Sequence, residues 1–450
     1  MEKLIKIKRA LISVSDKTGI VKLAQELCDR NVEIVSTGGS ASILRDAGFN
    51  VTEVSKLTGF PEMMDGRLKT LHPKVHGGLL AIRDKKSHLK AMEEYKVKEI
   101  DLLVVNLYPF AETVKAGADY AQCIENIDIG GPAMIRAAAK NFKYVATLVD
   151  IQDYEGLVNE LKMNNGCTSY SFRQKLSQNA FSLTAYYDAM VSNWMLDNIT
   201  GVKPRRFSIS AELSQDLRYG ENPHQSASFY LDENFQGGIG ASNQIQGKNL
   251  SYNNINDTDA ALELVNEFSK NDGAAAVIVK HANPCGVGVA NSLVEAYRSA
   301  LSCDETSAFG GIVAVNHIID EESAREIIKV FTEVVIAPGI TEGARKIFSS
   351  KSNLRLLINE KSPDLACSSK VIKHIVGGYL LQDKDIEPLS QNNLRVVTKR
   401  SPTENEFQDM LFAWKVAKHV KSNAIVYAKD RATVGIGAGQ MSRVDSCRIA

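Results

Sequence analysis

The sequence has no excess of one charge. Its 450 residues include 53 Lys plus Arg and 53 Asp plus Glu, which gives a formal net charge of +0 at pH 7. A balanced chain produces no broad field that would gather nucleic acid or an anionic membrane. We therefore expect neither as a partner, and any anion site must be local.

Paired cysteines and long apolar runs are missing as well. No apolar run approaches the roughly 20 residues that span a bilayer, and the N-terminal stretch MEKLIKIKRALISVS lacks the apolar region and cleavage site of a secretory signal. The cysteines are scattered, with no CxxC pair, which is typical of reduced thiols in the cytoplasm and argues against structural zinc. They are Cys28, Cys123, Cys167, Cys285, Cys303, Cys367 and Cys447. These absences predict a cytoplasmic protein.

What the sequence does contain is an alternation of strand-like and helix-like segments. Runs such as RALISVS and DLLVVNL alternate with helix-period segments such as GIVKLAQELCDR up to about Asp150. This alternation predicts βαβ units and a parallel sheet. The pattern resumes in the second half of the chain, whose length exceeds that of a single core. We place a domain boundary near Val202, between regions 1–201 and 202–450.

Two loops in the first region each follow a predicted strand and open a helix. In SVSDKTG (13–19) and STGGS (36–40), free backbone N–H groups, hydroxyls and Lys17 would converge on an anion. Either loop alone is equally well explained as an N-cap with a turn. Two such loops at one sheet edge favour a phosphate pocket, because ligands bind beyond the carboxyl ends of parallel strands.

The stretch MDGRLKTLHPKVHGG concentrates cations between glycines and a proline. Arg67 and Lys69 share a face if the chain is extended there. The alternative is a solvated basic loop, which would not need three glycines and a proline in fifteen residues. His72 and His76 would need a helix to form a metal-binding pair, and Pro73 argues against one.

The stretch ENIDIGGPAMIRAAAKN places Asp128 before a Gly-Gly turn, with Pro132 at a helix N1 position. Arg136 and Lys140 then lie four residues apart on one helical face, so an anionic substrate or a carboxylate is expected opposite them. Tyr108 in NLYPF ends a strand at the same sheet edge, although a core role alone would explain a single tyrosine.

These five motifs, in this order, resemble the IMP cyclohydrolase domain of the AICAR transformylase/IMP cyclohydrolase family. The resemblance implies an α/β fold with a methylglyoxal-synthase-like, Rossmann-type N-terminal domain that closes the purine ring of FAICAR with loss of water. The implied nucleotide-site residues are Ser13, Ser15, Lys17, Ser36, Thr37, Gly38, Arg67 and Thr70, and the implied catalytic residues are Lys69, Tyr108, Asp128 and Lys140.

This assignment agrees with the chemistry of ring closure. An amide nitrogen must attack a formyl carbon, and the developing oxyanion could be stabilised by Lys69 or Lys140 together with the Tyr108 hydroxyl. Asp128 is the candidate for moving the amide proton.

In the second region, VIVKHANPCGVGVA (277–290) places Lys280 and His281 where a buried strand gives way to a turn. A lone histidine at such a place is most simply a core residue, but an imidazole that titrates near neutral pH also suits a general base. AIVYAKDRATVGIGAG has the same order of strand, charged turn and Gly-bearing strand, which hints at two related half-domains.

LRYGENPHQ, KNLSYNNINDTDAA, VIVKHANPCGVGV, SAFGGIVAVN and GIGAGQMSR resemble the transformylase half of the same family. The resemblance implies two cytidine-deaminase-like α/β subdomains, a homodimer that shares its active site, and formyl transfer from 10-formyltetrahydrofolate to AICAR. His281 would take the amine proton, Lys280 would stabilise the oxyanion or assist the folate nitrogen, and Asn423 would orient the reacting groups. The implied substrate-binding residues are Arg218, Tyr219, Asn249, Phe309, Gly310, Arg443 and Glu333, the last at a position where the family commonly has Asp.

Metal content and the end of the sequence leave alternatives open. PCGVG lacks the second thiol of a deaminase zinc site, so no catalytic metal is expected, whereas the family implies a structural monovalent cation. Family members continue past GIGAGQMSR through an aromatic stretch that completes the folate site, while this sequence stops at Ala450. We therefore expect either a truncated sequence or an incomplete transformylase half. The alternatives are a cyclohydrolase-only enzyme, a phosphate-ligand-binding regulatory protein, and a lyase on a phosphorylated triose, which would account for the first domain alone.

Overall fold

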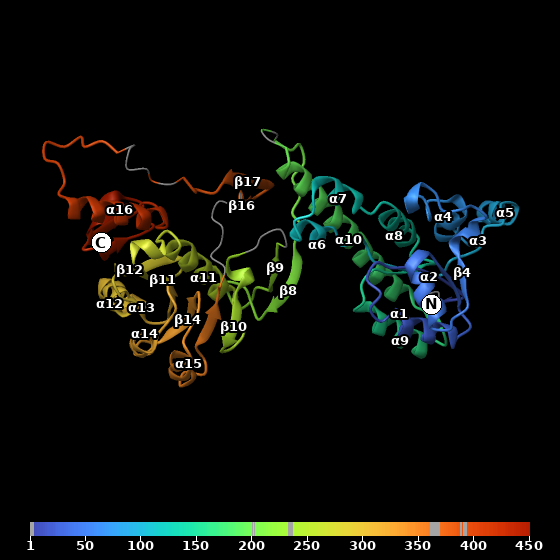
Figure 1. Ribbon diagram of the computed structural model, residues 1–450, viewed down its shortest axis with the longest axis horizontal. Helices are drawn as coiled ribbons and strands as arrows, with labels where there is room; N and C mark the ends of the chain where they lie inside the picture. Colours follow the sequence, from blue (N-terminus) through green and yellow to red (C-terminus); the bar gives the residue numbers. More distant parts are fainter. Residues whose placement is uncertain are drawn as a thin grey trace. The chain divides into compact units, whose positions relative to one another are not determined.

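The computed structural model describes residues 4–199, 201, 203–232, 237–360, 370–387, 389 and 394–450. The chain divides into two compact units, Met1–Ala211 and Glu212–Ala450, shown in Figure 1. The boundary predicted at Val202 lies outside the described residues.

Unit 1 is built on a five-stranded parallel sheet in the order β4-β3-β2-β5-β6. Its strands are β2 (Arg9–Ser13), β3 (Glu33–Ser36), β4 (Val51–Glu53), β5 (Leu102–Val105) and β6 (Ala146–Leu148), and a separate antiparallel pair joins β1 (Ile5–Lys6) to β7 (Cys167–Thr168). The predicted parallel α/β sheet is confirmed. The strand order reverses between β2 and β5, and ligands of open α/β sheets bind in the crevice at such a switch point.

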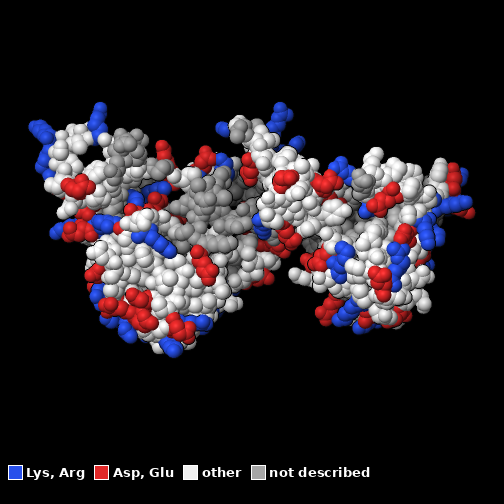
Figure 2. All heavy atoms as spheres, viewed as in Figure 1, with Lys and Arg blue, Asp and Glu red and all other residues white. Residues whose placement is uncertain are grey.

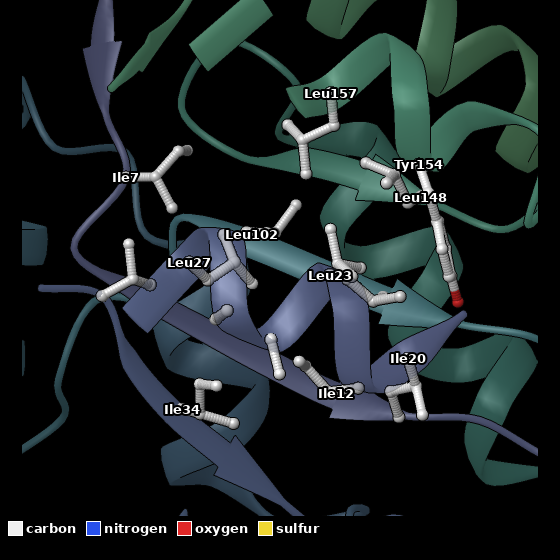
Figure 3. Packing of buried hydrophobic residues seen from close by; sticks show 14 of the residues in the cluster. Ile7, Ile12, Ile20, Leu23, Leu27, Ile34, Leu102, Leu148, Tyr154 and Leu157 are labelled. Carbon is white, nitrogen blue, oxygen red and sulfur yellow. The ribbon is translucent and has the colours of Figure 1, made fainter. Parts of the chain in front are cut away.

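Helices cover both faces of this sheet. On one face, Ile20, Leu23 and Leu27 of α1 pack on alternate strand residues such as Ile12 and Ile34, as Figure 3 shows. The intervening strand residues face a second core, formed with α4, α8 and α10. The helices are α1 (Ile20–Cys28), α2 (Gly38–Asp46), α3 (Val54–Thr58), α4 (Pro73–Leu80), α5 (Lys86–Glu94), α6 (Phe110–Lys115), α7 (Tyr120–Glu125), α8 (Gly130–Lys140), α9 (Asp153–Met163) and α10 (Tyr170–Asp197).

Two prolines differ from their expected places. Pro73 does not prevent a helix but begins α4, because the first helical position needs no N–H donor. His72 caps that helix by accepting the Lys74 N–H at 3.1 Å. Pro132 lies at the third position of α8 rather than at its first. Both corrections leave the predicted helix after Asp128 in place.

Unit 2 contains an eight-stranded mixed sheet in the order β10-β15-β14-β13-β11-β12-β19-β18. The strands are β10 (Asn243–Gln246), β11 (Ala274–Lys280), β12 (Asn283–Ala290), β13 (Gly311–Val315), β14 (Thr332–Ala337), β15 (Arg355–Ile358), β18 (Ile425–Lys429) and β19 (Ala432–Gly437). Only β13, β14 and β15 run parallel to one another. Two separate hairpins are formed by β8 (Glu212–Leu217) with β9 (Ala227–Leu231), and by β16 (Lys370–Ile375) with β17 (Gly378–Asp383).

Helices also cover both faces of the unit 2 sheet. Helix α11 and helix α16 share one core with the inward side chains of β11 to β14, and α12, α14 and α15 share the core on the other face. The helices are α11 (Tyr252–Val265), α12 (Leu293–Cys303), α13 (Glu305–Ala308), α14 (Glu321–Ile327), α15 (Glu342–Ser349), α16 (Glu404–Lys418) and α17 (Arg443–Ile449).

The two similar stretches of sequence, VIVKHANPCGVGVA and AIVYAKDRATVGIGAG, form two hairpins of the same construction. Hairpins β11-β12 and β18-β19 are both antiparallel, and each is followed by a helix, α12 and α17 respectively. Both helices approach their strand at a glycine. A Cβ at Gly286 would lie 1.9 Å from the Ala300 carbonyl oxygen, and one at Gly437 would lie 1.9 Å from that of Ser446. The two halves thus contribute to one continuous sheet.

The face drawn in Figure 2 carries both charges. Figure 2 shows Lys and Arg interspersed with Asp and Glu over the visible face of each unit. Within the described residues, no helix has both the length and the apolar character needed to cross a bilayer.

Candidate functional site

A cavity of about 560 Å³ opens in unit 1 at the carboxyl ends of β2 and β5. It is the crevice that the strand order predicts. Ser13, Ser15, Lys17, Thr37, Gly38, Arg67, Lys69, Thr70, Tyr108 and Asp128 all line it. The structure therefore brings together ten of the twelve residues that the family resemblance assigns to this domain.

One wall of the cavity is the N-terminus of α2. The Thr37 side chain does not cap this helix, because its hydroxyl lies 3.0 Å from the Ser13 hydroxyl instead. Two ammonium groups converge on the same turn. If Gly38 carried a Cβ atom, that atom would lie 3.7 Å from the Lys69 Nζ. A Cβ atom on Gly39 would lie 3.4 Å from the Lys17 Cε. Uncapped N–H groups, hydroxyls and two cations form a cradle suited to a phosphate.

Asn106, at the end of β5, shapes the first loop of this cradle. Its Oδ1 accepts the backbone N–H groups of Ser15 at 2.5 Å and Asp16 at 3.0 Å, and its Nδ2 donates to the Asp16 carbonyl at 2.8 Å. One side chain on β5 thereby fixes the loop that leaves β2. Lys17 completes the loop by donating to the Ser15 carbonyl at 2.8 Å.

The two cations of the basic stretch have carboxylate partners at the cavity rim. Lys69 lies 2.8 Å from Glu62, and the Arg67 guanidinium pairs with Glu125 at the end of α7. The hydrogen bond from the Arg67 guanidinium holds the pKa of the Glu125 carboxyl below its usual value. A phosphorylated ligand would have to compete with these exposed pairs, which are weak in water.

Asp128 also lines the cavity and is largely buried. Its Oδ1 accepts the Gly131 N–H at 2.8 Å, and the Tyr108 N–H also donates to the carboxylate. Burial raises its pKa above the usual value in spite of these bonds. Tyr187 on α10 fixes the turn that precedes Asp128. Its hydroxyl accepts the Asp128 N–H at 2.9 Å and donates to the Asn126 carbonyl at 3.2 Å. Asp128 is thus a fixed carboxylate in a partly dry site.

Two of the predicted residues do not reach the cavity. Ser36 is fully buried, and its hydroxyl donates to the Ile12 carbonyl at 2.7 Å. Lys140 is the last residue of α8, whose first turn adjoins Asp128. Eleven helical residues separate these ends by roughly 15 Å. Among the described residues, the lysines that line the cavity are Lys17 and Lys69.

In unit 2, the predicted residues gather along one edge of the eight-stranded sheet. The register pairs Val279 with Ile312, Gly311 with Thr332 and Val334 with Arg355, so that the end of β11 and the starts of β13, β14 and β15 share that edge. Lys280, His281, Phe309, Gly310, Glu333, Asn249, Asn423 and Arg443 lie at strand ends or in the connections along it.

The Lys280 side chain is anchored by a neighbouring backbone carbonyl. The Lys280 Nζ donates to the Phe309 carbonyl at 2.8 Å, and His281 is exposed in the two-residue turn after it. Phe309 stacks beside Phe331, with ring centroids 5.3 Å apart. Phe309 and Phe331 are more than half exposed, at 60% and 51%, and so present an apolar surface to solvent.

Asn423 and Glu333 are also held in place along this edge. The Asn423 Nδ2 donates to the carbonyls of Gln440 at 2.9 Å and Met441 at 3.1 Å, just before α17 begins at Arg443. Arg355 pairs with Glu333 at 2.8 Å and donates to the Asn249 carbonyl at 3.2 Å.

Arg218 and Tyr219 come from the β8-β9 hairpin. The Arg218 guanidinium lies 5.5 Å from the centroid of the Tyr219 ring. A hydrogen bond of 3.4 Å from the Asn253 Nδ2 to the Glu221 carbonyl links this connection to the first turn of α11.

Sequence reasoning missed several residues that shape these sites. Asn106 had a signal, because it stands in NLYPF directly after a strand. Tyr187 and Arg355 had none, since each acts on a segment distant in sequence. Such partners become visible only when the fold is known.

Family models match almost the whole chain. The model described as AICARFT/IMPCHase bienzyme matches residues 138–450, and the model of the MGS-like domain matches residues 19–133.

Curated relatives match along the whole length. The chain is 61% identical over 450 residues to the bifunctional purine biosynthesis protein PurH of Dinoroseobacter shibae, covering 100% of this chain and 85% of that protein. It is 58% identical over 450 residues to the protein of the same name from Ruegeria pomeroyi, again with 100% and 85% covered.

The cradle generates a prediction about Lys17. Inorganic phosphate should bind there, and Lys17→Ala should weaken binding about 10- to 100-fold, since a charge-assisted hydrogen bond contributes about 1.5–3 kcal/mol. Isothermal titration calorimetry would give the Kd. Lys22→Ala removes the same charge from an exposed position on α1 and should leave the Kd unchanged. Equal weakening by both variants would show that only overall charge matters.

Proposed function

The chain belongs to the AICARFT/IMPCHase bienzyme family, and on that premise we propose how its residues divide the two reactions. The chain is a bifunctional enzyme of purine biosynthesis, with AICAR formyltransferase and IMP cyclohydrolase activities and a formyl-folate as cosubstrate. The alternatives of a cyclohydrolase-only enzyme and a phosphate-binding regulator are not favoured, because the match to PurH proteins includes every residue of this chain.

We assign formyl transfer to the sheet edge of unit 2, with 10-formyltetrahydrofolate as the donor. The AICAR amine is a weak nucleophile, so it must lose a proton as its nitrogen bonds to the formyl carbon. His281 takes that proton. Lys280, held on the Phe309 carbonyl, is adjacent and stabilises the developing oxyanion or assists the departing folate nitrogen.

Substrate binding in unit 2 is assigned along the same edge. Asn423 orients the reacting groups, Arg443 binds phosphate, and the exposed Phe309 ring with Gly310 contacts AICAR or the folate. Arg218, Tyr219, Asn249 and Glu333 complete the AICAR site. The link from Glu333 through Arg355 to Asn249 supports this grouping.

We assign ring closure to the cavity of unit 1. The cradle of Ser13, Ser15, Lys17, Thr37 and Gly38 binds the phosphate of FAICAR. Asp128 accepts the amide proton while the nitrogen attacks the formyl carbon, and Lys69 with the Tyr108 hydroxyl stabilises the oxyanion. Loss of water then gives IMP. The convergence of these groups on one cavity supports the assignment.

The cellular setting is proposed from weaker signals. The cysteines within the described residues are free thiols, which supports a cytoplasmic location. Cys367 lies outside the described residues. No step is assigned to a metal ion, and a structural monovalent cation stays a prediction.

Two single substitutions test the division between the sites. His281→Ala should lower formyl transfer by about 10²- to 10⁴-fold, the contribution of a general base, while cyclisation of supplied FAICAR is unchanged. Lys69→Ala should lower cyclisation by about 10²- to 10³-fold, as expected for an oxyanion donor, and leave formyl transfer intact. Chromatographic measurement of FAICAR and IMP separates the two reactions.

Lys140→Ala provides the matched comparison for Lys69→Ala. Because Lys140 lies at the far end of α8, its loss should change cyclisation by less than about threefold. A loss equal to that of Lys69→Ala would place Lys140 in the chemistry instead. Loss of both activities from either His281→Ala or Lys69→Ala would contradict two independent sites.

The raised pKa of Asp128 predicts the pH dependence of cyclisation. A base must be deprotonated, and burial moves its protonation to higher pH than for an ordinary Asp. The acid limb of kcat for FAICAR cyclisation should therefore lie above pH 3.8, the usual Asp value. Asp128→Asn should be slow at every pH and lack this limb. The same limb persisting in Asp128→Asn would assign it to another group.

We propose that the protein is a homodimer whose contact includes the β16-β17 hairpin. Neighbouring strand residues point to opposite faces, yet Leu380 and Leu381 are 55% and 44% exposed and Tyr379 is 65% exposed. An isolated two-stranded hairpin is marginally stable in water. A second copy that covers both faces would remove this apolar surface from solvent.

Sedimentation analysis tests the dimer. The unaltered chain should sediment as a dimer, and Leu380→Glu should shift it toward monomer by placing a charge in the contact. Leu89→Glu is the control, because Leu89, 44% exposed against 55% for Leu380, is a similarly accessible leucine but lies on α5 of unit 1. A monomeric unaltered chain, or equal effects of the two variants, would overturn the proposal.

A further inference from the structure

The turn that carries His281 has an unusual backbone. His281 and Ala282 have φ of 53° and 54°, the left-handed region that disfavours residues with a Cβ. Two consecutive residues of this kind join antiparallel β11 and β12 as a two-residue hairpin loop, in which Asn and Gly are the usual choices. His and Ala are therefore poor residues for the conformation they adopt, and something outside the turn must stabilise it.

The outside support is the carboxylate of Asp257. Its Oδ2 accepts the His281 N–H at 3.0 Å and its Oδ1 accepts the Ala282 N–H at 3.0 Å. Asn283 holds the other side, donating from Nδ2 to the His281 carbonyl at 3.0 Å. Asp257 is the sixth residue of α11, a helix fixed at its start by a capping box between Ser251 and Asn254. The turn is thus tied to a rigid element.

The same device occurs a second time in unit 2. Asp430 and Arg431, between β18 and β19, have φ of 52° and 58°. The Asp409 carboxylate accepts their N–H groups at 3.0 Å and 2.8 Å. Asp409 is the sixth residue of α16, which also begins with a capping box, between Thr403 and Glu406.

The two turns lie at opposite ends of the sheet. The His281 turn follows the pair of Lys280 with Asn283, at the edge that holds the predicted substrate residues. The other turn adjoins the far end of β12, where the Val289 N–H donates to the Arg431 carbonyl at 2.9 Å. The two turns are supported in the same way. Of the two, only the first carries a histidine at the edge that holds the predicted substrate residues.

We propose that Asp257 is a positioning residue for formyl transfer. Its carboxylate holds the left-handed turn so that the His281 imidazole stands beside Lys280 and Phe309, where the AICAR amine must lose its proton. The proposal rests on the assignment of His281 as the base.

The geometry specifies a carboxylate and not an amide. Each carboxylate oxygen accepts one backbone N–H of the turn, and Oδ1 also accepts a hydrogen bond from the Asn256 Nδ2 at 3.1 Å, so both oxygens are used. An asparagine has one oxygen and one NH₂ group, and its NH₂ would face a backbone N–H. Asp257→Asn is therefore nearly the same size and yet unable to hold both ends of the turn.

The experiment compares Asp257→Asn with Asp409→Asn in the full chain. Asp257→Asn should lower kcat for formyl transfer about 10- to 100-fold, as small misplacement of a reacting group does, while KM for AICAR changes less than about threefold. Asp409→Asn makes the same change at the far turn and should leave kcat within about threefold. Cyclisation of supplied FAICAR should be unaffected in both and shows that unit 1 is folded.

A second substitution tests whether backbone conformation is the cause. Glycine adopts the left-handed region readily, so Ala282→Gly in the Asp257→Asn background should restore at least about a third of the lost kcat. An unchanged kcat in Asp257→Asn, an equal loss in Asp409→Asn, or failure of the glycine to rescue would each overturn the proposal. His281→Ala is measured alongside, because full formyl transfer by that variant would reject the base assignment itself and not the support of the turn.

Discussion

Both sheets are covered by helices on each face, and this burial decides where polar chemistry can be placed. All four residues of β5 and all five of β13 are buried, as are six of the seven in β11. A charged group on such a strand would be desolvated without a partner, at a cost of several kcal/mol. The strand ends are the nearest positions that combine a rigid backbone with access to solvent. In unit 1 the candidate site therefore includes residues that follow β2 and β5, and in unit 2 it includes residues that follow β11 and its neighbours.

Confinement to the strand ends also sets the electrostatics of the unit 1 cavity. The cradle side has an uncapped helix N-terminus and two ammonium groups, which favour an anion. The Asp128 side is partly buried, which raises the pKa of that carboxyl and makes it a better proton acceptor than an exposed aspartate. The cradle and Asp128 are held by different elements, so the proposed phosphate site and the proposed proton acceptor are separate parts of the cavity lining.

The sequence was sufficient for the parallel sheet, the loops after its strands and ten of the residues that line the cavity. Apolar runs reveal buried strands, and Gly-rich loops after them reveal helix N-termini, because both signals are local. The place of Lys140 could not be predicted, since its spacing in the sequence says nothing of which end of α8 faces the cavity, and its role in the chemistry stays a prediction. Pro73 shows another limit, because a proline either ends a helix or begins one and only the surrounding structure decides. Tyr187, Arg355 and Asp257 could not be predicted, as each supports a segment far away in sequence.

Comparison of the β11-β12 and β18-β19 hairpins distinguishes a support that belongs to the fold from the role proposed for one turn in formyl transfer. Both turns require a carboxylate, and both obtain it from the sixth residue of a capped helix, so the arrangement belongs to the repeated scaffold. At the far end it holds Asp430 and Arg431, where Arg431 also donates to the Asp272 carbonyl and serves packing. At the substrate edge the same left-handed turn displays a histidine, and the cost of the poor turn residue is offset by the same two hydrogen bonds. A structural support of this kind lets the residue proposed as the base adopt a backbone conformation that it would otherwise rarely adopt.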